Sequence, residues 1–270
     1  MKKINNSRFI IIVIVCTGIL VHFDALSQKL PNKQDISMRA PADIKIDGKS
    51  AEWKDNFQAY NSATQLFYTI ANDDDNFYLT IKVVDLDVVR KIFFSGITLA
   101  MQKTGTKEKI SVTYPLIEPN HPIGFVGIYN RKGEPIDTSS KTKDSIMKRN
   151  NATLDRNCKY LRVTGINGFD TISVYNELGI KAAGRFNQAK AYILELAFPL
   201  KYADFITNKD AVFRYNIVIN GFSAGSPGPN HPMPNSSPEM LEMIDKMNAS
   251  YIAKNAPTDF WGEYTLAKKP

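Results

Sequence analysis

Apolar and polar residues alternate along most of the chain, and β-branched and aromatic side chains are frequent in the same segments. Because a strand points successive side chains to opposite faces, a period of two predicts strands. Stretches rich in Asn, Asp, Gly and Thr separate these segments and favour turns. We therefore expect an all-β sandwich or barrel. The predicted strands cover residues 64–71, 76–85, 91–103, 109–116, 158–165, 170–184, 189–200, 211–221 and 260–268.

One segment near the C-terminus has a helical pattern instead. Ser237 is suited to an N-cap, and Pro238 is suited to the first helical position. Four apolar residues then fall on one helix face: Met240, Ile244, Met247 and Tyr251. The pattern predicts one amphipathic helix before the last strand, over residues 237–253, which packs against the strands. A methionine-rich stripe could also serve a cofactor, but core packing is its commoner cause.

Two further regions have no clear period. Residues 117–157 are polar with frequent Gly, Pro, Lys and Asn, and residues 222–236 hold too many prolines for a regular ladder. Long loops on a rigid scaffold often carry binding residues. We see neither an internal repeat nor a linker that divides the chain, so we expect a single domain.

The N-terminus has the pattern of an export signal. Basic residues precede an apolar run over residues 9–21, and Ala25-Leu26-Ser27 offers small residues for cleavage before Gln28. The run is shorter than the ~20 residues of a membrane-spanning helix. Val15 before Cys16 does not fit a lipobox. We expect a signal peptide over 1–27, a tail over 28–39, and an exported protein, periplasmic or extracellular, without a transmembrane anchor after cleavage.

Charge and cysteine content narrow the function classes. The formal charge is +7, but the lysines are scattered and no basic helix or aromatic-interleaved motif gathers them, so we expect no nucleic-acid partner. Cys158 is the only cysteine after residue 27, so no internal disulfide can form. The sequence also lacks a nucleophile elbow, a phosphate loop and a His-Glu-x-x-His motif, and we expect no enzymatic activity.

Several segments, read together, resemble the family 9 carbohydrate-binding module and its DOMON-like relatives. Their order along the chain matches that family, over residues 40–268. The quoted segments are IKIDGKSAEW (44–53), ANDDDNFYLTIKVVD (71–85), AYILELAFPL (191–200), AVFRYNIVING (211–221) and PTDFWGEYTLA (257–267). The resemblance implies a single antiparallel β-sandwich that binds a glycan or sugar-like ligand, and it leaves room for other exported proteins as partners. Trp53 is expected in the core rather than as a sugar platform.

Sugars stack their apolar faces on aromatic rings, while polar side chains bind their hydroxyls. Family members hold the sugar between two tryptophans, and this chain has only Trp53 and Trp261, both at positions that look structural. Loop residues are the best substitutes, with Arg131 as a further hydroxyl partner. The candidate ligand-binding residues are Asn120, His121, Phe125, Tyr129, Phe222, Asn230, His231 and Trp261.

The sequence Pro-Asn-His-Pro occurs twice, and its histidines are the only two after residue 27. If the fold brings the loops together, His121 and His231 could share a metal, assist a ligand or give pH sensitivity. Coincidence in loops rich in Pro and Asn is the simpler explanation. Some DOMON-like relatives bind haem through Met with His or Lys, for which Met101 and Met233 are available here.

Acidic residues cluster around one predicted hairpin and suggest structural calcium, because hard cations prefer several converging oxygens. The candidate ligands are Asp73, Asp75 and Asp85, with Asp74 and Asp87 nearby. A solvated turn explains the same residues. The resemblance implies a non-catalytic exported carbohydrate-binding protein. The alternative is a structural or protein-interaction sandwich that contacts partners through the 222–236 loop and the following helix.

Overall fold

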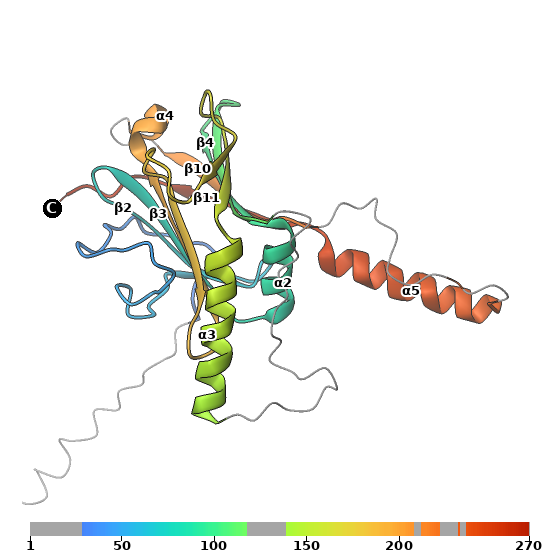
Figure 1. Ribbon diagram of the computed structural model, residues 1–270. Coiled ribbons are helices and arrows are strands. Elements are labelled where there is room, and N and C mark those ends of the chain that lie inside the picture. The colour runs from blue at the N-terminus through green and yellow to red at the C-terminus, as the bar shows by residue number, and fades with distance from the viewer. Residues whose placement is uncertain (1–28, 118–138, 208–211, 222–231, 233–235, 270) are drawn as a thin grey trace, which may run out of the picture. The chain divides into compact units, whose positions relative to one another are not determined.

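Two antiparallel sheets make up most of the fold (Figure 1). The computed structural model describes residues 29–117, 139–207, 212–221, 232 and 236–269. Residues 31–270 form one compact unit. The first sheet has the order β1-β2-β3-β9-β8, and the second has the order β11-β10-β4-β5-β6-β7. The non-sequential neighbours mean that the chain crosses between sheets several times.

Each sheet combines strands from distant parts of the sequence. The first contains β1 (Ala59–Asn61), β2 (Leu66–Asn72), β3 (Asn76–Val83), β8 (Lys181–Phe186) and β9 (Tyr192–Pro199). The second contains β4 (Ile97–Lys103), β5 (Lys109–Leu116), β6 (Tyr160–Thr164), β7 (Thr171–Ser173), β10 (Phe213–Ile219) and β11 (Thr258–Tyr264).

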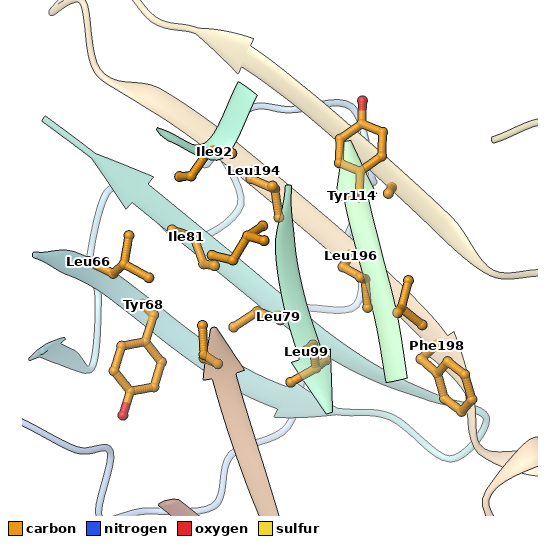
Figure 2. Close-up of a cluster of buried hydrophobic side chains, with 14 of the residues drawn as sticks. Leu66, Tyr68, Leu79, Ile81, Ile92, Leu99, Tyr114, Leu194, Leu196 and Phe198 are labelled. Carbon is orange, nitrogen blue, oxygen red and sulfur yellow. The ribbon is translucent and has the colours of Figure 1, made fainter. Parts of the chain in front are cut away.

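One hydrophobic core joins the two sheets, which is the arrangement of a β-sandwich. Leu79, Ile81 and Leu196 come from the first sheet and pack in the same cluster as Leu99 from the second (Figure 2). Strand β9 is buried along its whole length because its outer face is also covered. The predicted antiparallel β-sandwich is confirmed at this level of architecture, although the fold is mostly β rather than all-β.

Helices fill the connections between strands. They are α2 (Leu86–Ser95), α3 (Ser140–Asn157), the short α4 (Asp204–Thr207), α5 (Pro238–Asn255) and the 3-10 turn η1 (Leu200–Tyr202). Helix α2 buries Val89, Ile92 and Phe93 in the core. Helix α3 is fixed to β8 by Asn151, whose side chain exchanges hydrogen bonds with the backbone of Phe186 at 2.8 and 3.0 Å.

The structure corrects four sequence-based expectations about strands and helices. The strand predicted over 91–103 begins only at Ile97, because residues 91–95 belong to α2. The region 117–157, expected to be irregular, contains α3. The strand predicted over 170–184 is two strands, β7 and β8, which lie in different sheets. Helix α5 exists as predicted, but none of its residues is buried, so the expected packing of its apolar face against the sheets is wrong.

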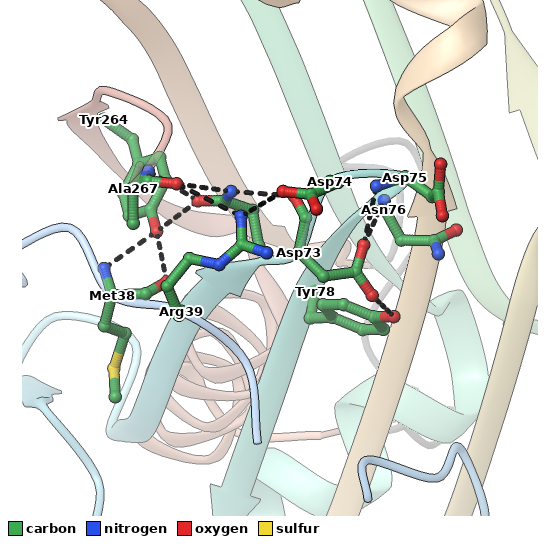
Figure 3. A network of polar contacts seen from close by, with 10 residues as sticks. Met38, Arg39, Asp73, Asp74, Asp75, Asn76, Tyr78, Tyr264 and Ala267 are labelled. Atoms are coloured by element: carbon green, nitrogen blue, oxygen red, sulfur yellow. Dashed lines mark hydrogen bonds and ion pairs between the residues drawn. The ribbon is translucent and has the colours of Figure 1, made fainter. Parts of the chain in front are cut away.

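The segment before residue 40, expected to be a tail, is part of the compact unit from Pro31 onward. Figure 3 shows its attachment at Met38 and Arg39. The backbone N–H of Met38 donates to the hydroxyl of Tyr264 at 3.1 Å. The side chain of Asn72 accepts a hydrogen bond from the N–H of Ala267 at 2.7 Å. The two ends of the unit are therefore joined beside β2.

Across the part of the chain that the structure describes, no helix combines the length and hydrophobicity needed to cross a bilayer.

Candidate functional site

A surface groove of about 380 Å³ lies beside Trp261 on β11. We call it the Trp261 groove. Its lining residues are Lys33, Gln34, Asp35, Arg214, Trp261, Gly262 and Glu263. Trp261 is the only one of them that the sequence singled out as a ligand-binding residue.

Strand alternation explains why Trp261 lies in the groove. On β11, Phe260, Gly262 and Tyr264 are buried, whereas Trp261 and Glu263 belong to the other face of the strand. On the neighbouring β10, Arg214 is directly opposite Glu263. Its guanidinium carbon lies 4.5 Å from the centre of the indole ring, so a cation–π contact holds both side chains.

The opposite wall of the groove is the segment Lys33–Asp35, which Gln34 fixes in place. The side-chain amide of Gln34 donates to the carbonyl of Ile70 and accepts from its N–H, both at 2.7 Å. The backbone N–H of Gln34 donates to the hydroxyl of Tyr68 at 2.9 Å. Gln34 is buried, while its neighbours Lys33 and Asp35 are exposed. The wall is thus held by two independent sets of hydrogen bonds to β2.

The two carboxylates of the Trp261 groove are available to a ligand. Neither Asp35 nor Glu263 has a hydrogen bond or ion pair with another described residue. Lys33 and Arg214 balance their two negative charges. The groove therefore offers a large flat apolar ring, two carboxylates and a guanidinium, without a net charge that would select an ionic ligand.

A second groove, of about 540 Å³, lies on the other sheet, and we call it the Tyr60 groove. Its lining residues are Tyr60, Gln65, Phe67, Val84, Asp85, Leu86, Asp87 and Arg90. The rings of Tyr60 and Phe67 are 4.6 Å apart. Its charged groups are engaged within the protein, because Asp87 pairs with Arg90 at 3.0 Å and Asp85 caps α2.

The stretch IKIDGKSAEW packs on the outer face of β9. The carboxylate oxygen Oε2 of the fully buried Glu195 accepts hydrogen bonds from the N–H groups of Asp47, at 3.1 Å, and Gly48, at 3.0 Å. Trp53 is only 6% exposed, which confirms its predicted place in the core. Glu195 of β9 thus has a structural role.

This contact leaves three buried polar atoms without a hydrogen-bond partner among the described residues: Oε1 of Glu195, Oε2 of Glu52 and Nε1 of Trp53. Burial raises the pKa of Glu195 to about 7, against the lowering effect of the two N–H donors, and the nearby carboxylates of Glu52 and Asp47 raise it further. A protonated Glu195 would have an O–H to donate at Oε1, where no partner is described.

The predicted calcium ligands do not form one site. Asp73 and Asp75 precede β3 and Asp85 follows it, and a strand of 8 residues separates their ends by roughly 25 Å. Both oxygens of Asp73 accept hydrogen bonds, Oδ2 from the hydroxyl of Tyr78 and Oδ1 from the N–H groups of Asp75 and Asn76 (Figure 3). Burial raises the pKa of Asp73, but these hydrogen bonds and Arg39 outweigh it, so the net pKa is below the usual value.

The side chains of two other acidic residues of this region, Asp74 and Asp85, also have structural partners. Asp74 forms an ion pair with Arg39 at 2.8 Å. Oδ1 of Asp85 accepts hydrogen bonds from the N–H groups of Asp87 and Val88, as an N-cap does. Within the described residues, no three His, Cys, Asp or Glu side chains gather in a way that could hold a metal ion.

Several sequence-based candidates lie outside the described residues: Asn120, His121, Phe125, Tyr129, Arg131, Phe222, Asn230, His231 and Met233. Met101, named as a haem ligand, is fully buried in the hydrophobic core. Trp261 is the one candidate for ligand binding that the structure describes, and it lines a groove.

The sequence interpretation missed Arg214, Glu263, Lys33 and Asp35. Glu263 could have been found, since it is two residues from Trp261 and therefore lies on the same strand face. Asp35 could not have been found in this way, because the sequence does not show that residues 33–35 lie beside the last strand. No protein-family model and no curated protein matches this chain.

Proposed function

We propose that this protein is a non-catalytic exported carbohydrate-binding protein of the family 9 module type, and that it binds a neutral sugar in the Trp261 groove. The observation that carries the proposal is the combination at that groove of a partly exposed indole with two carboxylates that have no partner among the described residues. Sugar hydroxyls need hydrogen-bonding groups at the rim of an apolar platform, and this groove supplies both.

The charge balance supports a neutral ligand. Lys33 and Arg214 oppose Asp35 and Glu263 in the groove. An acidic sugar would meet two carboxylates and a cationic ligand would meet two positive groups, so either would be repelled in part. Arg214 already lies over one face of the indole, 4.5 Å from the ring centre, so a sugar would stack on the other face while the guanidinium bonds a hydroxyl at the ring edge.

The two tryptophans make a direct test possible. Trp53 is buried and Trp261 is partly exposed, so the variant Trp53→Phe, made in the chain from residue 28 onward, leaves one fluorescent reporter at the groove. We expect a saturable fluorescence change with a neutral oligosaccharide from a panel of hexose, pentose and amino-sugar oligomers.

Calorimetry with the same oligosaccharide then assigns the site. We expect Trp261→Ala to weaken binding by about fivefold or more, since a lost aromatic contact costs ~1 kcal/mol or more. Tyr60→Ala, in the other groove, is the matched control and should bind as the parent does. No binding of any sugar, or binding lost only in Tyr60→Ala, would overturn the proposed site.

A further inference from the structure

Helix α5 carries a row of apolar side chains that no part of the described chain buries. Met240, Met247 and Tyr251 are 46%, 49% and 42% exposed, and Ile244 is partly exposed. We call these four residues the α5 seam. An unburied apolar row of this length is unusual on a folded protein and marks a contact surface.

The spacing of the α5 seam is that of a coiled coil. Successive members are separated by four, three and four residues, which is the heptad a/d pattern. Ala249 lies on the opposite side of the helix and is exposed. Helices of this length gain most of their stability from packing an apolar face, so a partner that covers the seam would stabilise α5.

The charges of α5 indicate how a partner helix would be oriented. Lys246 is paired with Glu242 in the same helix, at 2.6 Å. Glu239 in the first turn makes the N-terminal end of α5 negative, and Lys254 in the last turn makes the C-terminal end positive. Two parallel copies would place like ends together, whereas two antiparallel copies would place each acidic end beside a basic one and align their helix dipoles favourably.

The seam is also complementary to itself in the antiparallel orientation. With the midpoint between Asp245 and Lys246 as the two-fold axis, Met240 meets Tyr251 of the second copy and Ile244 meets Met247. Each layer then pairs one a position with one d position. A two-fold interface requires such self-complementarity.

We propose that the protein forms a homodimer through antiparallel pairing of α5 with α5 of a second copy. The inference is independent of sugar binding. A membrane surface is a poorer partner, because α5 has three acidic and two basic residues and lacks the basic polar face of an interfacial helix.

Sedimentation velocity over a micromolar concentration series tests the pairing, with the chain from residue 28 onward. We expect a concentration-dependent dimer. The double variant Ile244→Glu, Met247→Glu should weaken it at least tenfold, because four carboxylates would meet at the centre. Ala249→Glu adds a like charge to the far side of the same helix and should dimerise as the parent does. Circular dichroism of each variant separates loss of pairing from loss of helix.

Cysteine cross-linking tests the orientation. Met240→Cys and Tyr251→Cys chains, mixed and oxidised, should form the mixed disulfide in preference to the Met240→Cys homodimer. A monomer at every concentration, a dimer that survives the double variant, or cross-linking of Met240→Cys to itself would each overturn the proposal.

Discussion

The carboxylate of Glu195 accepts a hydrogen bond of 3.0 Å from the backbone N–H of Gly48, across 147 positions of the sequence. Asp47 donates to the same oxygen at 3.1 Å. This contact fastens the segment around Asp47 and Gly48 to the outer face of β9. The N–H groups of the Ile-Asp-Gly turn therefore bind the buried side chain of Glu195. Trp53, which follows this turn, belongs to the core.

Stability should depend on pH through Glu195. Its pKa is raised from 4.5 to about 7 by burial, so the folded protein holds this proton after the unfolded chain has lost it. The stabilisation that the protonated Glu195 adds to the free energy of unfolding is therefore fully present below about pH 4.5. It falls as the pH rises to about 7, and above that pH it is lost and the free energy no longer changes through Glu195. The loss is on the order of 3 kcal/mol at most.

The variant Glu195→Gln should remove this part of the pH dependence, because the neutral amide keeps an acceptor oxygen for Gly48 and cannot ionise. Urea unfolding at pH 5 and pH 8 measures the difference for each chain. Glu177→Gln, an exposed position, is the control and should keep the parental difference. An equal pH dependence in the parent and in Glu195→Gln would show that Glu195 does not cause it.

Gly48 should resist substitution more strongly than another glycine with the same backbone conformation. Gly48 has a φ of +78°, and a Cβ there would lie 2.9 Å from the backbone nitrogen of Arg185. Gly105 has a φ of +77° with no atom within 4 Å of its Cβ position. We expect Gly105→Ala to cost ~1 kcal/mol from φ alone, and Gly48→Ala to cost clearly more. Equal unfolding free energies for the two variants would contradict the role of close packing.

Asp85 should stabilise α2 whether or not calcium is present. Its Oδ1 accepts hydrogen bonds from Asp87 at 2.8 Å and Val88 at 3.0 Å. Removing an N-cap costs ~1 kcal/mol, so Asp85→Ala should lower the unfolding free energy by that amount in calcium and in EDTA alike. Asp75→Ala, at an exposed turn, should leave it unchanged. A cost that appears only in calcium would restore Asp85 as a metal ligand.

The alternation of side chains predicted most strands to within a few residues, because each sheet has one face in the core. It failed at residues 91–95, where an apolar run continues from α2 into β4. The helix had its own signals, with Asp85 as N-cap, Gly96 as C-cap, and Val89, Ile92 and Phe93 at helical spacing. Helix α3 was missed because its buried residues, such as Ile146 and Leu154, are few within a polar segment.

The candidate site was predictable only in part. Trp261 was identified because a tryptophan is rare and suited to sugars, whereas Arg214 and Asp35 join it through strand order and through the attachment of Gln34 to β2. Local patterns do not report which strands are neighbours. The helical pattern of α5 was predicted correctly, but its packing against the sheets was not, because the spacing of apolar residues does not show whether a core covers them.

Cys158 should be inert in the folded protein. Its thiol is 6% exposed, and burial, with Asp155 nearby, raises its pKa to about 12. The thiolate is the reactive form, and very little of it exists at pH 8. In the chain from residue 28 onward, which lacks Cys16, we expect a thiol reagent to label Ala249→Cys rapidly at its exposed new cysteine, while the parent reacts only as it unfolds and completely in urea. Labelling of the native parent at the rate of Ala249→Cys would show that Cys158 is accessible.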